Sequence, residues 1–197
     1  MLFETPINLD LKDGNIIYHP LFFNKIDADE YFSRLLNNID WKQDTITLFG
    51  KTHLQPRLTA FFANNNRPYK YSNIMMQPNK FNGDLLNIKK KIETKLNIEF
   101  TSCLANLYRH GKDSNGWHAD NEKELGPEPI IASVSFGAER IFQLKHRYNK
   151  ALRTKLVLQH GSLLIMKGQT QSHWLHQIPK TNKAIGKRIN LTFRIIA

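Results

Sequence analysis

The chain has 197 residues, of which 41% are hydrophobic and 11% aromatic, so its length suits a single domain and its composition excludes an intrinsically disordered protein. No apolar run is long enough to span a membrane, and the N-terminus lacks the basic start and apolar stretch of a signal peptide, so we expect an intracellular protein. Lys and Arg number 28 against 17 Asp and Glu, a formal charge of +11, which favours a polyanionic partner, although solubilising lysines would give the same excess.

The first part of the chain predicts one short strand and two helices. Residues 15–18 have the apolar character of a strand that ends before Pro20. Asp27 and Glu30 resemble a capping box, and the apolar residues that follow at helical spacing predict a helix that packs against a sheet. Residues 84–97 predict a second helix, with one apolar face and a lysine-rich face exposed to solvent.

Between these helices lies a segment that is rich in turn formers and cations. Residues 45–49 alternate weakly, and Phe49-Gly50-Lys51 predicts the tip of a hairpin. Residues 52–80 predict irregular backbone, interrupted by the aromatic residues Phe61, Phe62, Tyr69 and Tyr71. Aromatic rings mixed with cations suit contact with nucleic acid, because rings stack on bases and cations meet phosphates. The alternative is a loop whose aromatic side chains fold back onto the core.

From residue 100 onward, short apolar runs are separated in many places by Gly, Asn, Asp or Pro. These runs are residues 102–109, 130–136, 140–145, 155–159, 162–167 and 188–196. The pattern predicts an antiparallel sandwich or jelly roll that the earlier helices buttress. Cys103, the single cysteine, lies in the first run and is interpreted as a buried small hydrophobe, because no disulfide can form within the chain.

Histidine and aspartate residues in this second half suggest a metal site. His118 and Asp120 are two residues apart, so on an extended segment their side chains point to the same side. Further histidines follow at 173 and 176. Two histidines and one carboxylate are the ligands of a facial triad, which holds Fe(II) and leaves positions open for a co-substrate and O2. The alternative is that these are hydrogen-bonded structural side chains, since a His-x-Asp tripeptide is common by chance.

The last predicted strand alternates between polar and apolar side chains. The polar residues are Arg188, Asn190, Thr192 and Arg194. This row is either the ordinary outer face of a sheet or, in a sandwich with a ligand cavity, a row that points into the cavity. Guanidinium groups in a cavity bind carboxylates through paired, charge-assisted hydrogen bonds. Arg188 and Arg194 are about 20 Å apart along an ideal strand, so one small dicarboxylate would meet both only if their side chains converged.

Taken together, these motifs resemble those of the AlkB family of Fe(II)- and 2-oxoglutarate-dependent nucleic-acid demethylases. The matching segments are Asn106-Leu107-Tyr108, His118-Ala119-Asp120, His176 and residues 188–194. The likeness extends from about residue 45 to residue 196 and includes the non-catalytic segments 129–138 and 160–166. Within the family, the chain is similar to the animal homologue that repairs double-stranded DNA.

The resemblance implies an α+β fold, a double-stranded β-helix (jelly roll) with buttressing N-terminal helices and a nucleotide-recognition lid. It implies that Fe(II) is bound by His118, Asp120 and His176, the spacing to the arginine selecting His176 over His173. The residues implied to bind 2-oxoglutarate are Asn106, Tyr108, Arg188, Asn190, Thr192 and Arg194. O2 is the second co-substrate that the resemblance implies.

The resemblance also implies contacts with the nucleic acid. The residues concerned are Phe49, Gly50, Lys51, Arg57, Tyr69, Tyr71, Asn121 and Glu122. Phe49 matches an aromatic finger that enters a duplex, Tyr71 is placed to stack the base against His118, and Glu122 matches a carboxylate that contacts the damaged base. Asn121 stands where the similar homologue has a second acid, and Tyr71 stands where it has a phenylalanine, which affects substrate preference.

The expected function is therefore oxidative demethylation of 1-methyladenine and 3-methylcytosine in DNA, with duplex favoured. Single-stranded DNA or RNA is one alternative substrate, and a non-catalytic nucleic-acid-binding module is the alternative of another class. We expect a single domain over residues 1–197, with an N-terminal extension and lid over 1–100 and the catalytic core over 101–197. We further expect a monomer without membrane contact, in the bacterial cytoplasm or, in a eukaryote, the nucleus.

Overall fold

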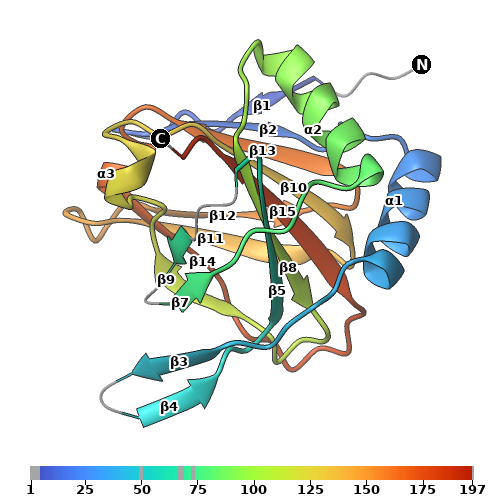
Figure 1. Cartoon of the computed structure of the whole chain (residues 1–197). Helices are drawn as coiled ribbons and strands as arrows, with labels where there is room; N and C mark the ends of the chain where they lie inside the picture. The colour runs from blue at the N-terminus through green and yellow to red at the C-terminus, as the bar shows by residue number, and fades with distance from the viewer. Residues whose placement is uncertain (1–4, 49–50, 66–68, 72–73, 197) are drawn as a thin grey trace.

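The computed structural model describes residues 5–48, 51–65, 69–71 and 74–196, and in this part of the chain two antiparallel sheets face each other (Figure 1). The larger sheet has seven strands, in the order β1 (Ile7–Asn8), β2 (Asn15–His19), β13 (Ser162–Lys167), β10 (Ile131–Gly137), β15 (Arg188–Arg194), β8 (Ser102–Tyr108) and β5 (Leu58–Ala63). The smaller sheet has four strands, in the order β12 (Arg153–Leu158), β11 (Arg140–His146), β14 (Trp174–Ile178) and β9 (Asn115–His118). The expected α+β jelly roll is confirmed.

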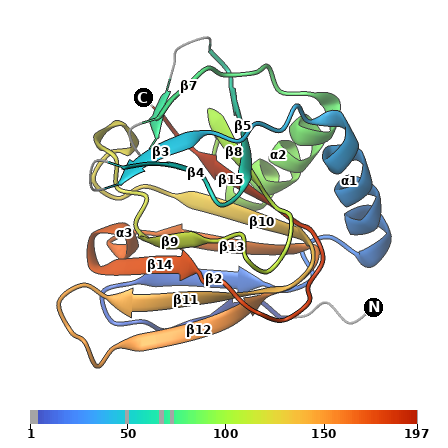
Figure 2. The same ribbon diagram turned by 90° about the horizontal axis from the view of Figure 1, so that it is seen from below.

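Two helices cover the face of the larger sheet that points away from the smaller one (Figures 1 and 2). They are α1 (Lys25–Asn38) and α2 (Gly83–Leu96). The predicted N-cap of the first helix, Asp27, is three residues late, because the side chain of Asn24 accepts a hydrogen bond from the backbone N–H of Asp27 and so caps the helix at Asn24. Asn82 caps α2 in the same way. Apolar residues of both helices, among them Leu35 and Ile88, are fully buried against the sheet.

The segment between the helices is more regular than its sequence predicted. Instead of a loop throughout residues 52–80, it contains strand β5, which pairs with β8 at the edge of the larger sheet. Phe61 and Phe62 are buried in this strand, so for these two rings folding back onto the core is the correct alternative. The prediction failed because flanking turn formers, Pro56 and residues 64–66, obscured a short apolar run.

The rest of this segment forms two small hairpins. Strands β3 (Thr45–Leu48) and β4 (Lys51–Leu54) pair as the predicted hairpin, which projects from the body of the molecule in Figure 1. Its predicted tip, Phe49 and Gly50, lies outside the described residues. Strands β6 (Tyr69–Tyr71) and β7 (Ile74–Met76) also pair. Two short helical segments complete the described elements, η1 (Lys123–Leu125) and α3 (Thr170–His173).

The space between the two sheets is apolar at one end and polar at the other. Trp174 and Leu144, from the smaller sheet, pack there with Ile16 and Leu164 of the larger sheet. Strand β15 lies in the middle of the larger sheet, and all seven of its residues are buried. Its polar side chains therefore do not form an exposed outer face, and they reach into the space between the sheets. Among the described residues, no helix is long and apolar enough to cross a membrane.

Candidate active site

His118, Asp120 and His176 converge where β9 meets β14. The two strands are antiparallel, and their register places His118 directly opposite His176. The imidazole centroids lie 4.2 Å apart, and His118 Nε2 is 3.9 Å from Asp120 Oδ1. One ligand atom from each of the three side chains lies within 4.8 Å of the others. Two imidazoles and one carboxylate at this spacing can hold a divalent metal on one side and leave its other side open.

The hydrogen bonds around His118 favour metal binding through Nε2. Its Nδ1 lies 2.7 Å from the carbonyl oxygen of Gly116, which can only accept, so the ring proton belongs on Nδ1. The lone pair of Nε2 then faces the site, where the side-chain amide of Asn115 donates to it at 3.1 Å. A backbone carbonyl that fixes the tautomer in this way is typical of metal-binding histidines.

Burial and charge keep all three ligands unprotonated at neutral pH. Burial lowers the pKa of His118 and lowers that of His176 to about 3. Burial by itself would raise the pKa of Asp120, but the charge of Arg194 and of the two histidines lowers it to about 2. Nη2 of Arg194 lies 2.9 Å from Asp120 Oδ1 inside the site. A metal would therefore meet little competition from protons.

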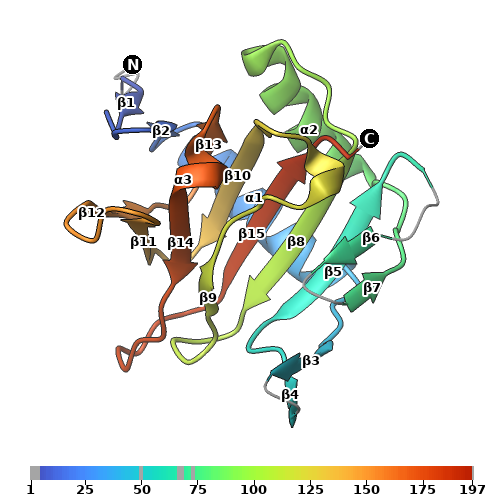
Figure 3. The ribbon, with the colours of Figure 1, turned by 90° about the vertical axis from the view of Figure 1, so that its left-hand side faces the viewer.

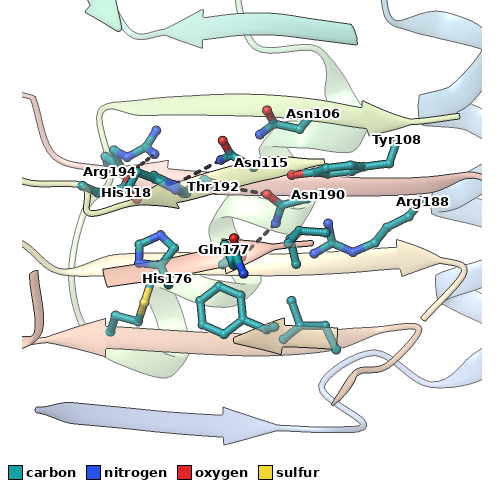
Figure 4. Close-up of a pocket in the computed structure, with 16 residues that line it drawn as sticks. Asn106, Tyr108, Asn115, His118, His176, Gln177, Arg188, Asn190, Thr192 and Arg194 are labelled. Atoms are coloured by element: carbon teal, nitrogen blue, oxygen red, sulfur yellow. Dashed lines mark hydrogen bonds and ion pairs between the residues drawn. The ribbon is translucent and has the colours of Figure 1, made fainter. Parts of the chain in front are cut away.

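Arg188 occupies the opposite end of the same cavity, beside Tyr108 (Figure 4). Its Nη2 donates to Ser135 Oγ at 2.9 Å, while Nε and Nη1 are buried without a hydrogen-bond partner among the described residues. Burial lowers the pKa of Arg188 to about 10, so the side chain remains a cation at neutral pH. A buried cation with two unpartnered nitrogens is costly unless an anion completes it, and a carboxylate matches the fork of a guanidinium.

Asn190 and Asn106 lie between the two ends of the cavity. The amide of Asn190 donates to Ser133 Oγ at 2.8 Å and accepts from Thr192 Oγ1 at 3.1 Å. Arg57, which the resemblance implies in the lid, is buried and donates from Nε to Asn106 Oδ1 at 2.8 Å. It therefore fixes the orientation of a cavity-lining amide.

The residues expected to touch nucleic acid are less completely described. Glu122 is partly buried, and its Oε2 has no hydrogen-bond partner among the described residues. Burial and the nearby charge of Asp120 raise the pKa of Glu122. Asn121 and Lys51 are exposed. Phe49 and Gly50 and the side chains of Tyr69 and Tyr71 lie outside what the structure describes.

Four residues that support the site were not identified from the sequence. Asn115, Ser133 and Ser135 are described above. The fourth is Gln171 of α3, whose Oε1 accepts from the backbone N–H of Asp120 at 2.9 Å. Ser133 and Ser135 could have been found from the sequence, because two serines at alternate positions of an otherwise apolar predicted strand indicate a polar cavity on one face. No sequence signal links Gln171 to Asp120, which is 51 residues away.

Comparisons of the sequence and the structure with known proteins agree with one another. Residues 15–194 match the 2OG-Fe(II) oxygenase superfamily. The chain is 44% identical to alpha-ketoglutarate-dependent dioxygenase alkB homolog 3 of Bos taurus over 90% of its residues, and it spans 64% of the length of that relative. It is 34% identical to DNA oxidative demethylase ALKBH2 of Homo sapiens, covering 90% of this chain and 72% of that protein. The solved structure of OsALKBH1 has the same fold, with a TM-score of 0.65 at 16% identity, over 96% of this chain and 100% of that one.

We predict that His176 and not His173 contributes to metal binding. His176→Ala should weaken Ni²⁺ binding by about 100-fold or more, because loss of a mere supporting contact already costs about 10–100-fold. His173→Ala is the matched control, since this residue lies outside the cluster and contacts the carbonyl of Gln169. Isothermal titration of the metal-free variants with Ni²⁺ measures both. Equal losses in the two variants would remove His176 from the ligand set.

We also predict that His176 makes the metal-free protein less stable in mild acid. The pKa of His176 is about 3 in the folded chain against an ordinary value of 6.5, so between these values the unfolded chain binds a proton that the folded chain does not. The free energy of unfolding should then fall by about 2 kcal/mol from pH 7 to pH 5 through this residue.

Urea unfolding in the presence of a chelator measures this pH dependence. In His176→Gln, the decrease in the free energy of unfolding between pH 7 and pH 5 should be smaller than in the wild type by about 2 kcal/mol. His173→Gln, which leaves His176 in place, should retain it. Identical pH dependence in the wild type and His176→Gln would contradict the prediction.

Proposed function

The chain belongs to the AlkB family of 2-oxoglutarate- and Fe(II)-dependent oxygenases, and we propose that it is an oxidative demethylase that repairs 1-methyladenine and 3-methylcytosine in DNA. Enzymes of this superfamily use Fe(II), 2-oxoglutarate and O2. The observation that carries the proposal is one cavity with the His118, Asp120 and His176 cluster at one end and the unsatisfied guanidinium of Arg188 at the other.

The residues present fit an iron ion and a dicarboxylate. His118 through Nε2, Asp120 and His176 would hold Fe(II), and Arg194 would keep the Asp120 carboxylate ionised and in place. Arg188 would bind a carboxylate of 2-oxoglutarate with its unused N–H groups. The other side chains that would contact 2-oxoglutarate are Asn106, Tyr108, Asn190, Thr192 and Arg194.

Fe(II), 2-oxoglutarate and O2 together supply the oxidation of an N-methyl C–H bond. One oxygen atom of O2 enters that bond to give an N-hydroxymethyl group, and the other enters succinate as 2-oxoglutarate loses CO2. The C–N bond of the N–CH2OH group then breaks: its carbon leaves as formaldehyde, the hydroxyl proton is released, and the electron pair of the bond stays on the ring nitrogen of the unmodified base. The buried walls of the cavity limit the access of water to this site.

A base inside a duplex cannot reach the cavity, so it must leave the stack at a cost of a few kcal/mol. A methyl group on the Watson–Crick edge already prevents pairing and lowers this cost. We propose that the projecting hairpin of β3 and β4 approaches the nucleic acid, with Lys51 near phosphate and Phe49 as the wedge. Glu122, beside the metal ligands, would contact the flipped base, with Asn121 next to it. Tyr69 and Tyr71 would complete the pocket.

Single-stranded DNA or RNA is the second candidate substrate, because the same cavity serves any accessible methylated base. We propose a monomer that consists of one domain, residues 1–197, with the lid in 1–100 and the core in 101–197. Nucleic acid as substrate implies action inside the cell, in the cytoplasm of a bacterium or the nucleus of a eukaryote. A non-catalytic binding module would have no use for an intact ligand set and a buried, uncompensated Arg188.

The test is demethylation in vitro. We expect protein loaded with Fe(II) and 2-oxoglutarate without oxygen, then mixed with air, to remove one methyl group from an oligonucleotide that carries one 1-methyladenine. Mass spectrometry measures the loss on duplex and on single strand, with omission of iron or 2-oxoglutarate as controls. Loss only on the single strand would exclude the duplex as substrate. No loss on either, from folded and metal-bound protein, would reject the demethylase.

Glu122 gives a second prediction about the methylated base. Glu122→Gln removes a carboxylate with an unpartnered buried oxygen, so demethylation should fall by about tenfold or more, the value of one charged hydrogen bond. Oxidation of 2-oxoglutarate without nucleic acid should continue. Glu124→Gln is the matched control, because Glu124 is exposed in the same segment. Equal effects of the two substitutions on demethylation, measured by formaldehyde release, would exclude the assigned contact.

A further inference from the structure

The outer face of the smaller sheet carries a basic and aromatic surface that the proposed reaction does not use. It consists of Trp117 on β9, Lys145 on β11, and Arg153 and Lys155 on β12, and we call it the outer-sheet surface. Successive side chains of a strand point to opposite faces. Because His118 faces the cavity, its neighbour Trp117 faces outward.

These four residues are adjacent across the strands. Lys145 pairs with Arg153 in the β11–β12 register, and its Nζ lies 4.4 Å from the centroid of the Trp117 ring. Lys155 pairs with Gln143 on the same face. An open depression of about 310 Å³ is lined by Trp117, Arg153 and Lys155, among other residues of the same strands. In Figure 2 these strands lie away from α1 and α2.

The charges of the outer-sheet surface are not neutralised by the protein. Within the described residues, no carboxylate lies at ion-pair distance from Lys145, Arg153 or Lys155, and Arg153 bonds only the carbonyl of Lys150. An alternative explanation is that the cations on β12, an edge strand, only prevent aggregation of this sheet with another one. That explanation leaves out Trp117, which is 39% exposed next to these cations.

We propose that the outer-sheet surface binds a single strand of nucleic acid, with phosphates on Arg153, Lys155 and Lys145 and a base stacked on Trp117. An aromatic platform beside a row of cations is how proteins bind single strands without reading their sequence. Four strands at about 4.8 Å spacing give a surface about 14 Å across, enough for more than one nucleotide.

The position of Trp117 connects this surface to the reaction. It precedes His118 on β9, the edge strand of its sheet, so the metal-binding cluster and the outer-sheet surface lie on the two faces of one strand (Figure 3). A strand whose methylated base entered the cavity could continue around the edge of β9 onto this surface. The inference rests on the proposed function and adds to it a second contact, outside the lid, for the flanking nucleotides.

The test compares two double charge reversals. Arg153→Glu/Lys155→Glu changes the surface, and Lys90→Glu/Lys95→Glu makes the same change of net charge on exposed lysines of α2 that make no ion pair in the described chain. Fluorescence anisotropy measures binding of an unmethylated DNA strand of about 20 nucleotides at several salt concentrations. We expect the surface variant to bind about tenfold more weakly than the α2 variant. When the logarithm of the binding constant is plotted against the logarithm of the salt concentration, the slope for the surface variant should be smaller in magnitude by about 1.4. This is the value for two lost phosphate contacts.

Tryptophan fluorescence tests the stacking contact separately. Of the three tryptophans, Trp174 is buried, Trp41 is partly buried with its Nε1 donating to the carbonyl of Leu36, and Trp117 is exposed, so a strand bound on this surface should quench the emission of Trp117. The quenching should be present in the wild type and absent from Trp117→Phe. Equal quenching in the wild type and in Trp117→Phe would overturn the proposal that a base stacks on Trp117.

The binding experiment requires no turnover, so its outcome is separate from that of the demethylation assay. Equal weakening in the two charge variants would mean that only net charge matters. It would overturn the proposal that the outer-sheet surface binds nucleic acid, even if demethylation is observed. Unchanged binding in both would also overturn it and leave the surface to a partner other than nucleic acid. Selective weakening in the surface variant would support the surface even if no methyl group were removed.

Discussion

The antiparallel pairing of β9 with β14 is the constraint on which the active site depends. It places His118 opposite His176, although 57 residues of other structure separate them in sequence, and Asp120 follows two residues after the first histidine. The two histidines are thereby held by backbone hydrogen bonds of a sheet, whereas Asp120 lies two residues past the end of β9. The carbonyl of Gly116 and the side chain of Gln171 then fix the ring of His118 and the backbone of Asp120. Such support outside the ligand set determines how precisely a metal is held.

The larger sheet supplies the other half of the cavity, with four lining residues on β15 and others on β8, β10 and β13. Because β15 lies between β8 and β10 and is covered on both sides, its alternate side chains serve two different environments. Ile189, Leu191 and Phe193 pack beneath the helices, while the polar residues face the smaller sheet. A shift of this strand by one residue would exchange the two sets, placing arginines in an apolar core. The apolar packing therefore also determines where Arg188 and Arg194 point.

Much of this arrangement could be predicted from the sequence, and the failures have physical reasons. The period-two pattern of residues 188–194 and the His-x-Asp spacing depend only on local geometry. Of the two alternatives that the first pattern left open, the structure has the polar row in the cavity, and the second pattern brings His118 and Asp120 into one cluster. The position of β5 was missed because its pairing with β8 is a long-range choice that overrides the turn formers around it. The hydrogen bond of Arg57 with Asn106 was also not anticipated. Only the folded structure shows that Arg57 lies beneath Asn106, since no pattern in the sequence links the two residues.

The two arginines of β15 have the same chemistry but different electrostatic environments. Arg194 is buried beside Asp120, and each charge offsets the cost of burying the other. Arg188 is buried beside Ser135 and over the ring of Tyr108, both neutral, which offset its desolvation only in part, so its pKa falls. A protein that retains such an incompletely compensated cation gives up stability at that position. An anionic ligand would recover it there, so the binding of a dicarboxylate should be strongest at Arg188 and should leave the ion pair of Arg194 with Asp120 intact.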